Sequence, residues 1–236
     1  MSSPLYWVQA NRLADDFPDT VEALAEPDGL LAAGGDLAPE RLVMAYRSGI
    51  FPWYSAGQPI LWWAPDPRSI VYPHALKISR SLRKTLKREQ FAVTIDQAFA
   101  AVIRECAAPR GDHTGTWITD SMIDAYGVLH RRGLAHSIEC WAMDELVGGL
   151  YGIAIGRVFF GESMFSRMTD ASKVAMVTLA AKLDHWDYEL IDCQVHNPHL
   201  ASLGAITIRR DEFNALLHKL CAAPPSPSAW GAGTPS

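Results

Sequence analysis

HSIECWAMDELVGGLYGIAIGRVFFGESMFS, residues 136–166, is the stretch that decides the fold. It contains three runs rich in apolar, β-branched and aromatic residues, and the short segments 143–145 and 155–157 between them supply turns. Runs of this composition joined by such short turns are typical of neighbouring antiparallel strands. The stretch therefore predicts a meander of three antiparallel strands.

Helices and strands alternate on either side of this meander. Upstream, FAVTID (91–96) alternates as a strand, Asp96 is suited to cap a helix that runs to about residue 107, and a second helix is expected from Asp120 to Arg132. The elements expected downstream are a helix from Ala171 to about His185, the strand YELIDCQV (188–195), the short helix NPHLASLG (197–204), the strand ITIRR (206–210) and the helix DEFNALLHKL (211–220). Alternation of this kind around an antiparallel meander predicts the α+β class.

The two ends of the chain differ in character from its centre. Residues 1–70 are rich in proline and glycine and contain one convincing helix, from about Ala38 to Ser48, with Pro39 in its first turn and Gly49 just past its end. The segment after Cys221, AAPPSPSAWGAGTPS, is rich in proline, serine and glycine. We expect a small loop-rich domain over residues 1–70, a larger domain with a mostly antiparallel central sheet over 71–221 and a disordered tail over 222–236.

The overall composition is that of a soluble globular protein, with 49% hydrophobic and 20% charged residues. No apolar run approaches the length of a membrane span, and the first residues, Met-Ser-Ser-Pro, do not resemble a signal peptide. The four cysteines, at 106, 140, 193 and 221, are scattered without a CxxC pair, so neither a disulfide framework nor a cysteine zinc site is indicated. We expect the protein to work in the cytoplasm.

The strand expected at 188–195 carries an acid and an amide two positions apart. With a period of two residues, Asp192 and Gln194 share one face, while Ile191, Cys193 and Val195 share the other. The apolar residues would then pack in a core, and the two polar groups would point together into a cleft or into water. An ordinary half-buried strand shows the same alternation, so the pattern alone does not assign a function.

Two stretches, IDCQVHNPHLASLGA (191–205) and GESMFSRMTDASK (161–173), together resemble the signature segments of the bacterial leucyl/phenylalanyl-tRNA–protein transferases. The resemblance covers nearly the whole chain except the first dozen residues and the tail after about Cys221. It implies that the larger domain has a fold like that of the GCN5-related acetyltransferases. Further similar segments, in the family's order, are GLLAAGGDLAPERLVMAYRSGIFPWYS (29–55), LWWAPDPRSIVYP (61–73), ISRSLRK (78–84), TWITDSMIDAYGVLH (116–130), AHSIECW (135–141) and LVGGLYG (146–152).

The resemblance implies transfer of leucine or phenylalanine, with methionine as a further candidate, from aminoacyl-tRNA to proteins whose first residue is arginine or lysine. In the family, this transfer marks proteins for degradation by the pathway that reads amino-terminal residues. The reaction is aminolysis of an activated ester and needs neither ATP nor metal. We therefore expect a monomer that uses Leu-tRNA and Phe-tRNA as co-substrates, with no other cofactor, no metal and no membrane partner.

Within that scheme, Asp192 and Gln194 are the expected catalytic pair. The carbonyl oxygen of Gln194 would orient the incoming amine, since an amide is too weak a base to remove the proton itself. Asp192 would either polarise Gln194 or stabilise the ammonium that develops. The vicinal ribose hydroxyl of the transfer RNA is a candidate to relay the proton to the leaving oxygen.

The resemblance also assigns residues to the aminoacyl-adenosine end of the transfer RNA. Trp53 and Trp117 lie in loop contexts, FPWYS and TGTWIT, where they would either stack on the terminal adenosine or anchor the loops by burying area. Glu162 and Asn197 would hold the ester, although Glu162 is also suited to be a solvated residue at a strand end. The pocket for the apolar side chain would include Leu150, Met164 and Ile191, and a flexible methionine suits a pocket that accepts two different shapes.

A basic stripe stands out in a chain whose net charge is −5. On a helix, Arg80, Lys84, Lys87 and Arg88 fall at spacings of four, three and one. The family places its transfer RNA contacts on the matching segment. A solvated helix face has the same pattern, so the stripe leaves both interpretations open.

Other constellations compete with this interpretation. Residues 161–165, GESMF, begin like a GxSxG nucleophile elbow, but Phe165 replaces the glycine that the sharp turn requires. Asp192, His196 and His199 do not fit a known zinc spacing. The alternative functions are an acyl-CoA-dependent acyltransferase, for which no glycine-rich pyrophosphate loop is found, and a non-catalytic RNA-binding module, which leaves Asp192 and Gln194 unexplained.

Overall fold

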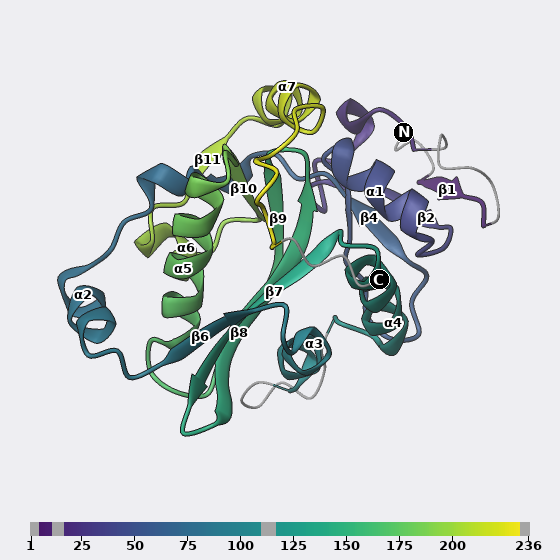
Figure 1. Cartoon of the computed structure of the whole chain (residues 1–236). Helices are drawn as coiled ribbons and strands as arrows, with labels where there is room; N and C mark the ends of the chain where they lie inside the picture. The colour runs from purple at the N-terminus through teal and green to yellow at the C-terminus, as the bar shows by residue number, and fades with distance from the viewer. Residues whose placement is uncertain (1–4, 11–16, 110–116, 232–236) are drawn as a thin grey trace.

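The computed structural model describes residues 5–10, 17–109 and 117–231, which form two β-sheets with helices packed around them (Figure 1). The smaller sheet has the strand order β1-β2-β4-β3 and the larger one β11-β5-β10-β9-β8-β7-β6. Strands and helices intermix along the chain, so the α+β class is confirmed. None of the helices in these residues is long and apolar enough to cross a lipid bilayer.

The smaller sheet belongs to the amino-terminal part of the chain. Its strands are β1 (Tyr6–Val8), β2 (Leu30–Gly34), β3 (Phe51–Pro52) and β4 (Leu61–Trp63). The expected helix is present as α1 (Pro39–Arg47), with proline in its first turn. Gly49 follows with a φ of 75°, and a Cβ there would lie 2.8 Å from Asn214 Oδ1, so glycine is required at this turn.

The predicted meander is confirmed and forms the middle of the larger sheet. Its strands are β7 (Ala135–Ala142), β8 (Glu145–Ile155) and β9 (Val158–Ser166), paired antiparallel. On one side β6 (Ala92–Ile95) pairs with β7, and on the other β10 (Leu190–Gln194) runs parallel to β9. The sheet continues antiparallel through β5 (Arg68–Val71) to β11 (Ile206–Ile208), so β9–β10 is a parallel pair in a mostly antiparallel sheet.

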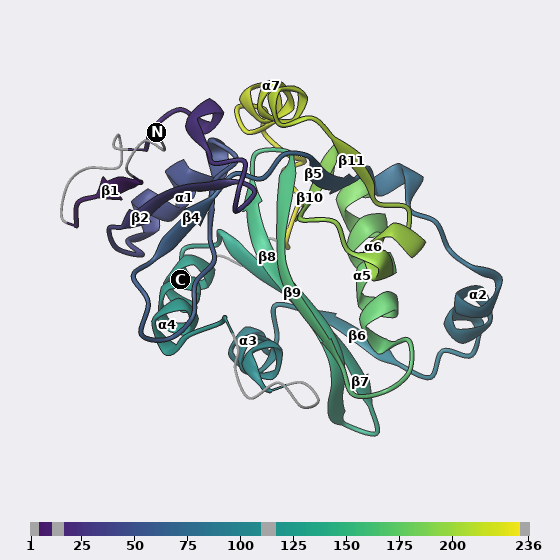
Figure 2. The same cartoon turned by 180° about the vertical axis from the view of Figure 1, so that it is seen from behind.

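Helices cover both faces of the larger sheet, as Figures 1 and 2 show from opposite sides. On one face, α5 (Ala171–His185) packs against β7 and β8. On the other face, α3 (Phe99–Ala107) and α4 (Asp120–Arg131) join a hydrophobic cluster that also contains core residues of the smaller sheet. The two sheets therefore share one core. The remaining helices are α2 (Arg80–Lys87), α6 (Pro198–Ser202), α7 (Arg210–Leu220) and the short 3-10 turns Thr20–Glu22 and Pro73–Ala75.

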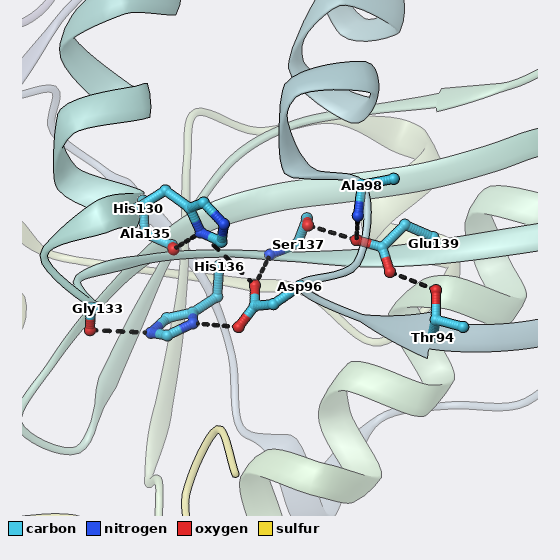
Figure 3. A network of polar contacts seen from close by, with 9 residues as sticks. All are labelled: Thr94, Asp96, Ala98, His130, Gly133, Ala135, His136, Ser137 and Glu139. Carbon is cyan, nitrogen blue, oxygen red and sulfur yellow. Dashed lines mark hydrogen bonds and ion pairs between the residues drawn. The ribbon is translucent and has the colours of Figure 1, made fainter. Parts of the chain in front are cut away.

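Asp96 does not cap the helix that follows it, contrary to the sequence-based expectation (Figure 3). It has a φ of 58°, and its side chain turns back to β7, where it contacts His136 Nδ1 at 2.7 Å and accepts from the Ser137 amide at 2.9 Å. Helix α3 begins at Phe99, and the backbone amide of Ala98 donates instead to Glu139 at 3.4 Å. The left-handed turn at Asp96 moves its carboxylate away from the helix end.

From its composition we expected the segment after Cys221 to be disordered, and for residues 222–231 this expectation is wrong. Residues 222–231 are described, whereas 232–236 lie outside the described residues. The Trp230 ring stacks on His136 with a centroid distance of 3.9 Å, and its Nε1 donates to Tyr188 Oη at 2.7 Å. A single large aromatic residue thus gives a segment of low-complexity composition a defined position.

Candidate active site

A cavity of about 760 Å³ opens where β8, β9 and β10 meet Trp53 and Trp117. Its wall brings together residues from the amino-terminal part, the central meander and the segment that follows β10. All residues that the sequence predicted for catalysis, ester binding and the apolar pocket lie in this wall: Trp53, Trp117, Leu150, Glu162, Met164, Ile191, Asp192, Gln194 and Asn197.

Glu162, on β9, is the centre of a buried polar cluster in this wall. Its Oε1 accepts from Tyr46 Oη at 2.7 Å and from Gln194 Nε2 at 2.8 Å, and its Oε2 accepts from Tyr126 Oη at 2.9 Å. The hydroxyl oxygens of Tyr46 and Tyr126 are 2.5 Å apart. The solvated strand-end role that the sequence left open for Glu162 is wrong, because the side chain is enclosed by these partners.

The two tyrosines and Glu162 form a closed ring of three oxygen–oxygen contacts. Each of these contacts needs one proton to be a hydrogen bond. When Glu162 is ionised, the two hydroxyl protons serve only two of the contacts, and a protonated Glu162 provides the proton for the third. Burial raises the pKa of Glu162 to about 7, although hydrogen bonds from Tyr46 and Tyr126 lower it. Burial raises the pKa of both tyrosines well above the usual range, so they remain hydroxyl donors. The cluster therefore gains or loses its proton at Glu162.

The sequence-based analysis missed Tyr46 and Tyr126. Tyr46, on α1, lies four positions after the buried Leu42, and Tyr126, on α4, lies four after Met122 and three before Leu129. Both rings are fully buried on the apolar faces of their helices. A buried tyrosine needs a hydrogen-bond partner for its hydroxyl, and this requirement was the available signal for a polar site between the helices.

Asp192 is fully buried and makes an ion pair with Arg68, the first residue of β5. Arg68 Nε and Nη2 donate to the two oxygens of Asp192 at 2.8 and 2.6 Å, which is a bidentate arrangement. The guanidinium also donates to the Gly49 carbonyl at 3.0 Å and lies over the rings of Phe51 and Phe213. Both oxygens of the carboxylate are thus engaged by Arg68.

The strand geometry around Gln194 corrects the expectation of a regular two-residue alternation. The register of β10 against β5 shifts between Asp192 and Gln194, and Gln194 has a φ of 62°. Its backbone amide donates to Asp192 Oδ1 at 2.9 Å, while its side chain reaches Glu162. Val195 is 40% exposed and does not join the core as the alternation predicted. Asp192 therefore contacts the backbone of Gln194, and Glu162 contacts the Gln194 amide group.

This arrangement fixes the orientation of the Gln194 amide. In its ionised form Glu162 only accepts hydrogen bonds, so the Gln194 NH₂ group then faces Glu162 and the carbonyl oxygen is left as an acceptor. Gln194 lies in the cavity wall, where this oxygen is suited to meet an N–H donor.

The residues expected at the adenosine end lie around the cavity. Trp53 is 41% exposed, and its carbonyl accepts from Trp63 Nε1 at 2.7 Å. Trp117 is half-buried. Asn197 is exposed and caps α6 by accepting from the His199 amide at 2.8 Å, so it is separate from the Glu162 cluster. The tryptophans offer aromatic surface at the cavity, and Asn197 lies in its wall.

The apolar part of the cavity lies beside the polar cluster. Leu150 and Ile191 are buried in its wall and Met164 is half-buried. Further apolar residues in the same wall are Phe159, Phe165, Met176 and Leu179.

The described residues include no group of three or more histidine, cysteine, aspartate or glutamate side chains placed to hold a metal ion.

The basic stripe lies on α2, away from the cavity wall. Helix α2 is capped by Ser79, whose side chain accepts from the Leu82 amide at 3.1 Å, and Leu82 is the buried anchor of the helix. The four stripe residues, Arg80, Lys84, Lys87 and Arg88, are exposed. Their exposure is compatible with both interpretations that the sequence left open.

Two family descriptions match the chain. Residues 70–218 match the family described as "Leucyl/phenylalanyl-tRNA protein transferase", and residues 35–66 match the amino-terminal domain of the same family. A leucyl/phenylalanyl-tRNA–protein transferase of Nitrosomonas europaea is 58% identical over 214 residues, which are 91% of each chain. One from Pseudomonas fluorescens strain SBW25 is 57% identical over 213 residues, 90% of this chain and 93% of that one.

Solved structures similar to this one include a GCN5-related N-acetyltransferase from Kribbella flavida, with a TM-score of 0.39 and 9% identity over 70% of this chain and 58% of that chain. The L-PGS structure from Bacillus licheniformis has a TM-score of 0.38 and 11% identity, over 71% and 53% of the two chains. The family matches extend over the segments that build the cavity, and the relatives match over nearly their full length. The chain therefore belongs to the leucyl/phenylalanyl-tRNA protein transferase family of aminoacyltransferases.

Proposed function

We propose that this protein transfers leucine or phenylalanine, with methionine as a further candidate, from aminoacyl-tRNA to the α-amine of proteins that begin with arginine or lysine. The observation that carries the proposal is the Gln194 amide, held by Glu162 beside an apolar cavity. An acceptor oxygen next to an apolar pocket is what aminolysis of an apolar aminoacyl ester needs, because one substrate brings N–H groups and the other an apolar side chain.

The donor would enter with its aminoacyl side chain in the apolar part of the cavity. Leu150, Met164 and Ile191 would contact that side chain, and its adenosine would stack on Trp53 and Trp117. Stacking of a base on an aromatic ring contributes about 1–3 kcal/mol per base. An apolar pocket separates substrates that differ by one methylene by only about 1–3 kcal/mol, so acceptance of more than one apolar amino acid follows from its chemistry.

The acceptor amine would reach the ester carbonyl with the Gln194 carbonyl oxygen as its hydrogen-bond acceptor. An α-amine has a pKa of about 7.7–8.0, so roughly one in ten is neutral at pH 7. The neutral amine nitrogen attacks the ester carbon, a peptide bond forms, and the bond to the ribose oxygen breaks. The proton lost by the amine passes to that leaving oxygen, with the vicinal ribose hydroxyl as the relay.

The main contribution of the protein would be positioning, which can lower a barrier by about 7–11 kcal/mol. Gln194 would orient the amine, and Glu162 would hold the Gln194 amide in the required orientation. Asp192 would act as a positioning residue, because both of its oxygens are engaged by Arg68 and it holds the backbone amide of Gln194. No cofactor or metal is required by this scheme.

The basic stripe would contact phosphate groups of the transfer RNA body.

We further propose that the protein works as a monomer in the cytoplasm, where charged transfer RNA is present, and that the transferred residue marks its targets for degradation.

The test is transfer of labelled leucine from purified Leu-tRNA to a peptide that begins with arginine. We expect a stable peptide bond with this peptide and with one that begins with lysine. An otherwise identical peptide with an acetylated amino terminus is the control and should receive no label. Equal labelling of the blocked peptide, or none of either peptide, would contradict the proposal.

A further inference from the structure

Residues 167–173, which run from the end of β9 into the first turn of α5, carry two cations, Arg167 and Lys173. We infer that Arg167 and Lys173 form a second phosphate site, which holds the last phosphate groups of the RNA 3′ end between the α2 stripe and the cavity. The inference rests on the proposed use of aminoacyl-tRNA and extends it to residues outside α2.

Arg167 lies in the cavity wall and is 63% exposed. Its Nε and Nη2 donate to the two oxygens of Glu105 at 2.9 and 2.7 Å. An arginine fork has five donors, so this pairing orients the guanidinium and leaves further N–H groups for a second acceptor. Because the ion pair is exposed, it contributes little to folding and is accessible to a competing anion.

Lys173 connects this position to α2. Its Nζ donates to Asp170 Oδ1 at 3.2 Å, and the other oxygen of Asp170 accepts from Thr85 on α2 at 2.9 Å. Lys173 also follows directly after Ser172, which lies in the cavity wall. Lys173 therefore lies between the basic helix and the cavity.

The remaining charges of the cavity wall do not suit a phosphate. Glu162 and Asp192 are buried acids with partners, and Glu105 is engaged by Arg167. Within the described part of the wall, Arg167 is the permanently charged cation. An RNA whose terminal base stacks in the cavity and whose body rests on α2 must pass the segment between them, and each linkage on that path carries a negative charge. Arginine matches phosphate geometry with its planar fork, and lysine adds a point charge.

The experiment compares three donors that carry the same leucyl ester. The first is leucyl-adenosine without phosphate, the second a leucylated trinucleotide ending in CCA, and the third full Leu-tRNA. The variants are Arg167→Gln with Lys173→Gln, Lys87→Ala with Arg88→Ala on α2, and Arg132→Gln as the matched control. Arg132 is also an exposed arginine paired with a carboxylate, Glu40 at 2.6 Å, but it lies outside the cavity wall.

We expect the Arg167→Gln/Lys173→Gln variant to raise KM about ten-fold or more for the trinucleotide and for Leu-tRNA, without the same rise for leucyl-adenosine. The α2 variant should raise KM for Leu-tRNA alone, and the control should match wild type with every donor. Wild-type KM for the trinucleotide in the Arg167→Gln/Lys173→Gln variant would overturn the inference. An equal loss with leucyl-adenosine would also overturn it, because the residues would then be structural.

A further variant separates phosphate binding from the ion pair itself. Glu105→Gln leaves the guanidinium without its competing carboxylate, so KM for the trinucleotide should stay the same or fall. If Glu105→Gln raises KM as much as the Arg167→Gln/Lys173→Gln variant does, the Arg167–Glu105 pair stabilises the segment and the phosphate site is wrong. Failure of wild type to transfer from any donor would contradict the proposed function instead, so the two failures are distinguishable.

Discussion

Gln194 donates its side-chain Nε2 to Oε1 of Glu162 across 2.8 Å, and this bond connects β10 to β9 inside the cavity wall. Glu162 in turn accepts from a tyrosine of α1 and a tyrosine of α4. The orientation of one amide therefore depends on three other elements of the fold.

Glu162→Gln should reduce the rate of transfer by about 100-fold or more, because a neutral amide at 162 no longer distinguishes the two ends of Gln194. A loss of one oriented donor or acceptor at a reacting centre typically costs about 10²–10³ in kcat. The measurement is kcat with Leu-tRNA and an Arg-initiated peptide, with binding of Leu-tRNA as the control. A rate within a few-fold of wild type would show that the orientation of Gln194 does not depend on the charge of Glu162.

The stability of the protein should fall as pH rises from about 4.5 to about 7 because of Glu162. The folded state raises the pKa of this acid from 4.5 to about 7, so between these values the folded protein holds a proton that the unfolded chain has lost. The contribution is fully present below 4.5 and is lost through 7, and amounts to about 3 kcal/mol at roughly 1.4 kcal/mol per pKa unit.

Urea unfolding of wild type and Glu162→Gln at pH 5, 6, 7 and 8 tests this prediction. The difference between the two free energies of unfolding should change by about 2.5 kcal/mol in favour of the variant between pH 5 and pH 8, since the glutamine does not titrate. Parallel curves over this range would mean that the pKa of Glu162 is not raised.

Tyr46→Phe and Tyr126→Phe should each move the acid limb of the rate–pH profile to higher pH. Both hydroxyls donate to Glu162 and thereby lower its pKa against the effect of burial, so their loss raises it further. The profile is measured with one peptide throughout, so that titration of its amine is common to all proteins. Tyr54→Phe is a suitable control, because its hydroxyl contacts Thr119 and not Glu162. A midpoint that does not move in either variant would exclude Glu162 as the group that titrates.

Asp192→Ala should reduce transfer by orders of magnitude and leave Leu-tRNA binding nearly intact. The same substitution should lower the free energy of unfolding by about 3–5 kcal/mol, because it leaves the buried Arg68 guanidinium without its carboxylate. Gln194→Ala should lower transfer similarly without that loss of stability, and the double variant should be much less than additive if the two residues act together. Full activity in both single variants would exclude the pair from the reaction.

Met164→Trp should exclude phenylalanine more than leucine, because the added ring fills the apolar part of the cavity and phenylalanine needs more volume. The measurement is the ratio of kcat/KM for Leu-tRNA to that for Phe-tRNA. Met143→Trp is the control, since Met143 is 92% exposed and outside the cavity wall. An unchanged ratio in Met164→Trp would place the side-chain pocket elsewhere.

Much of the fold could be predicted because the central elements have strong local patterns. The meander and the helix from Ala171 to His185 agree with the structure. Strand β5 was missed because it is short and begins with Arg68, a residue type that is seldom buried. Its burial depends on Asp192, which is distant in sequence and therefore invisible to a local pattern.

The candidate site residues were predicted through family resemblance, whereas the contacts between them required the structure. The bulge at Gln194 breaks the two-residue period at the point where the side chain must turn toward Glu162. Tyr46 and Tyr126 resemble ordinary core residues because their hydroxyls are satisfied by a carboxylate on a third element. Trp230 likewise orders a segment whose composition alone indicates disorder.

The shared core has a consequence for the modularity of the chain. The two matched family segments meet between residues 66 and 70, yet Tyr46 and Trp53 come from the first and Glu162 and Gln194 from the second. An exchange of the amino-terminal part for that of a relative would replace at once the segment that supplies a hydroxyl donor to Glu162, an aromatic residue of the cavity wall and packing against α4. The two parts are therefore interdependent halves of one catalytic unit, and neither is a transplantable module.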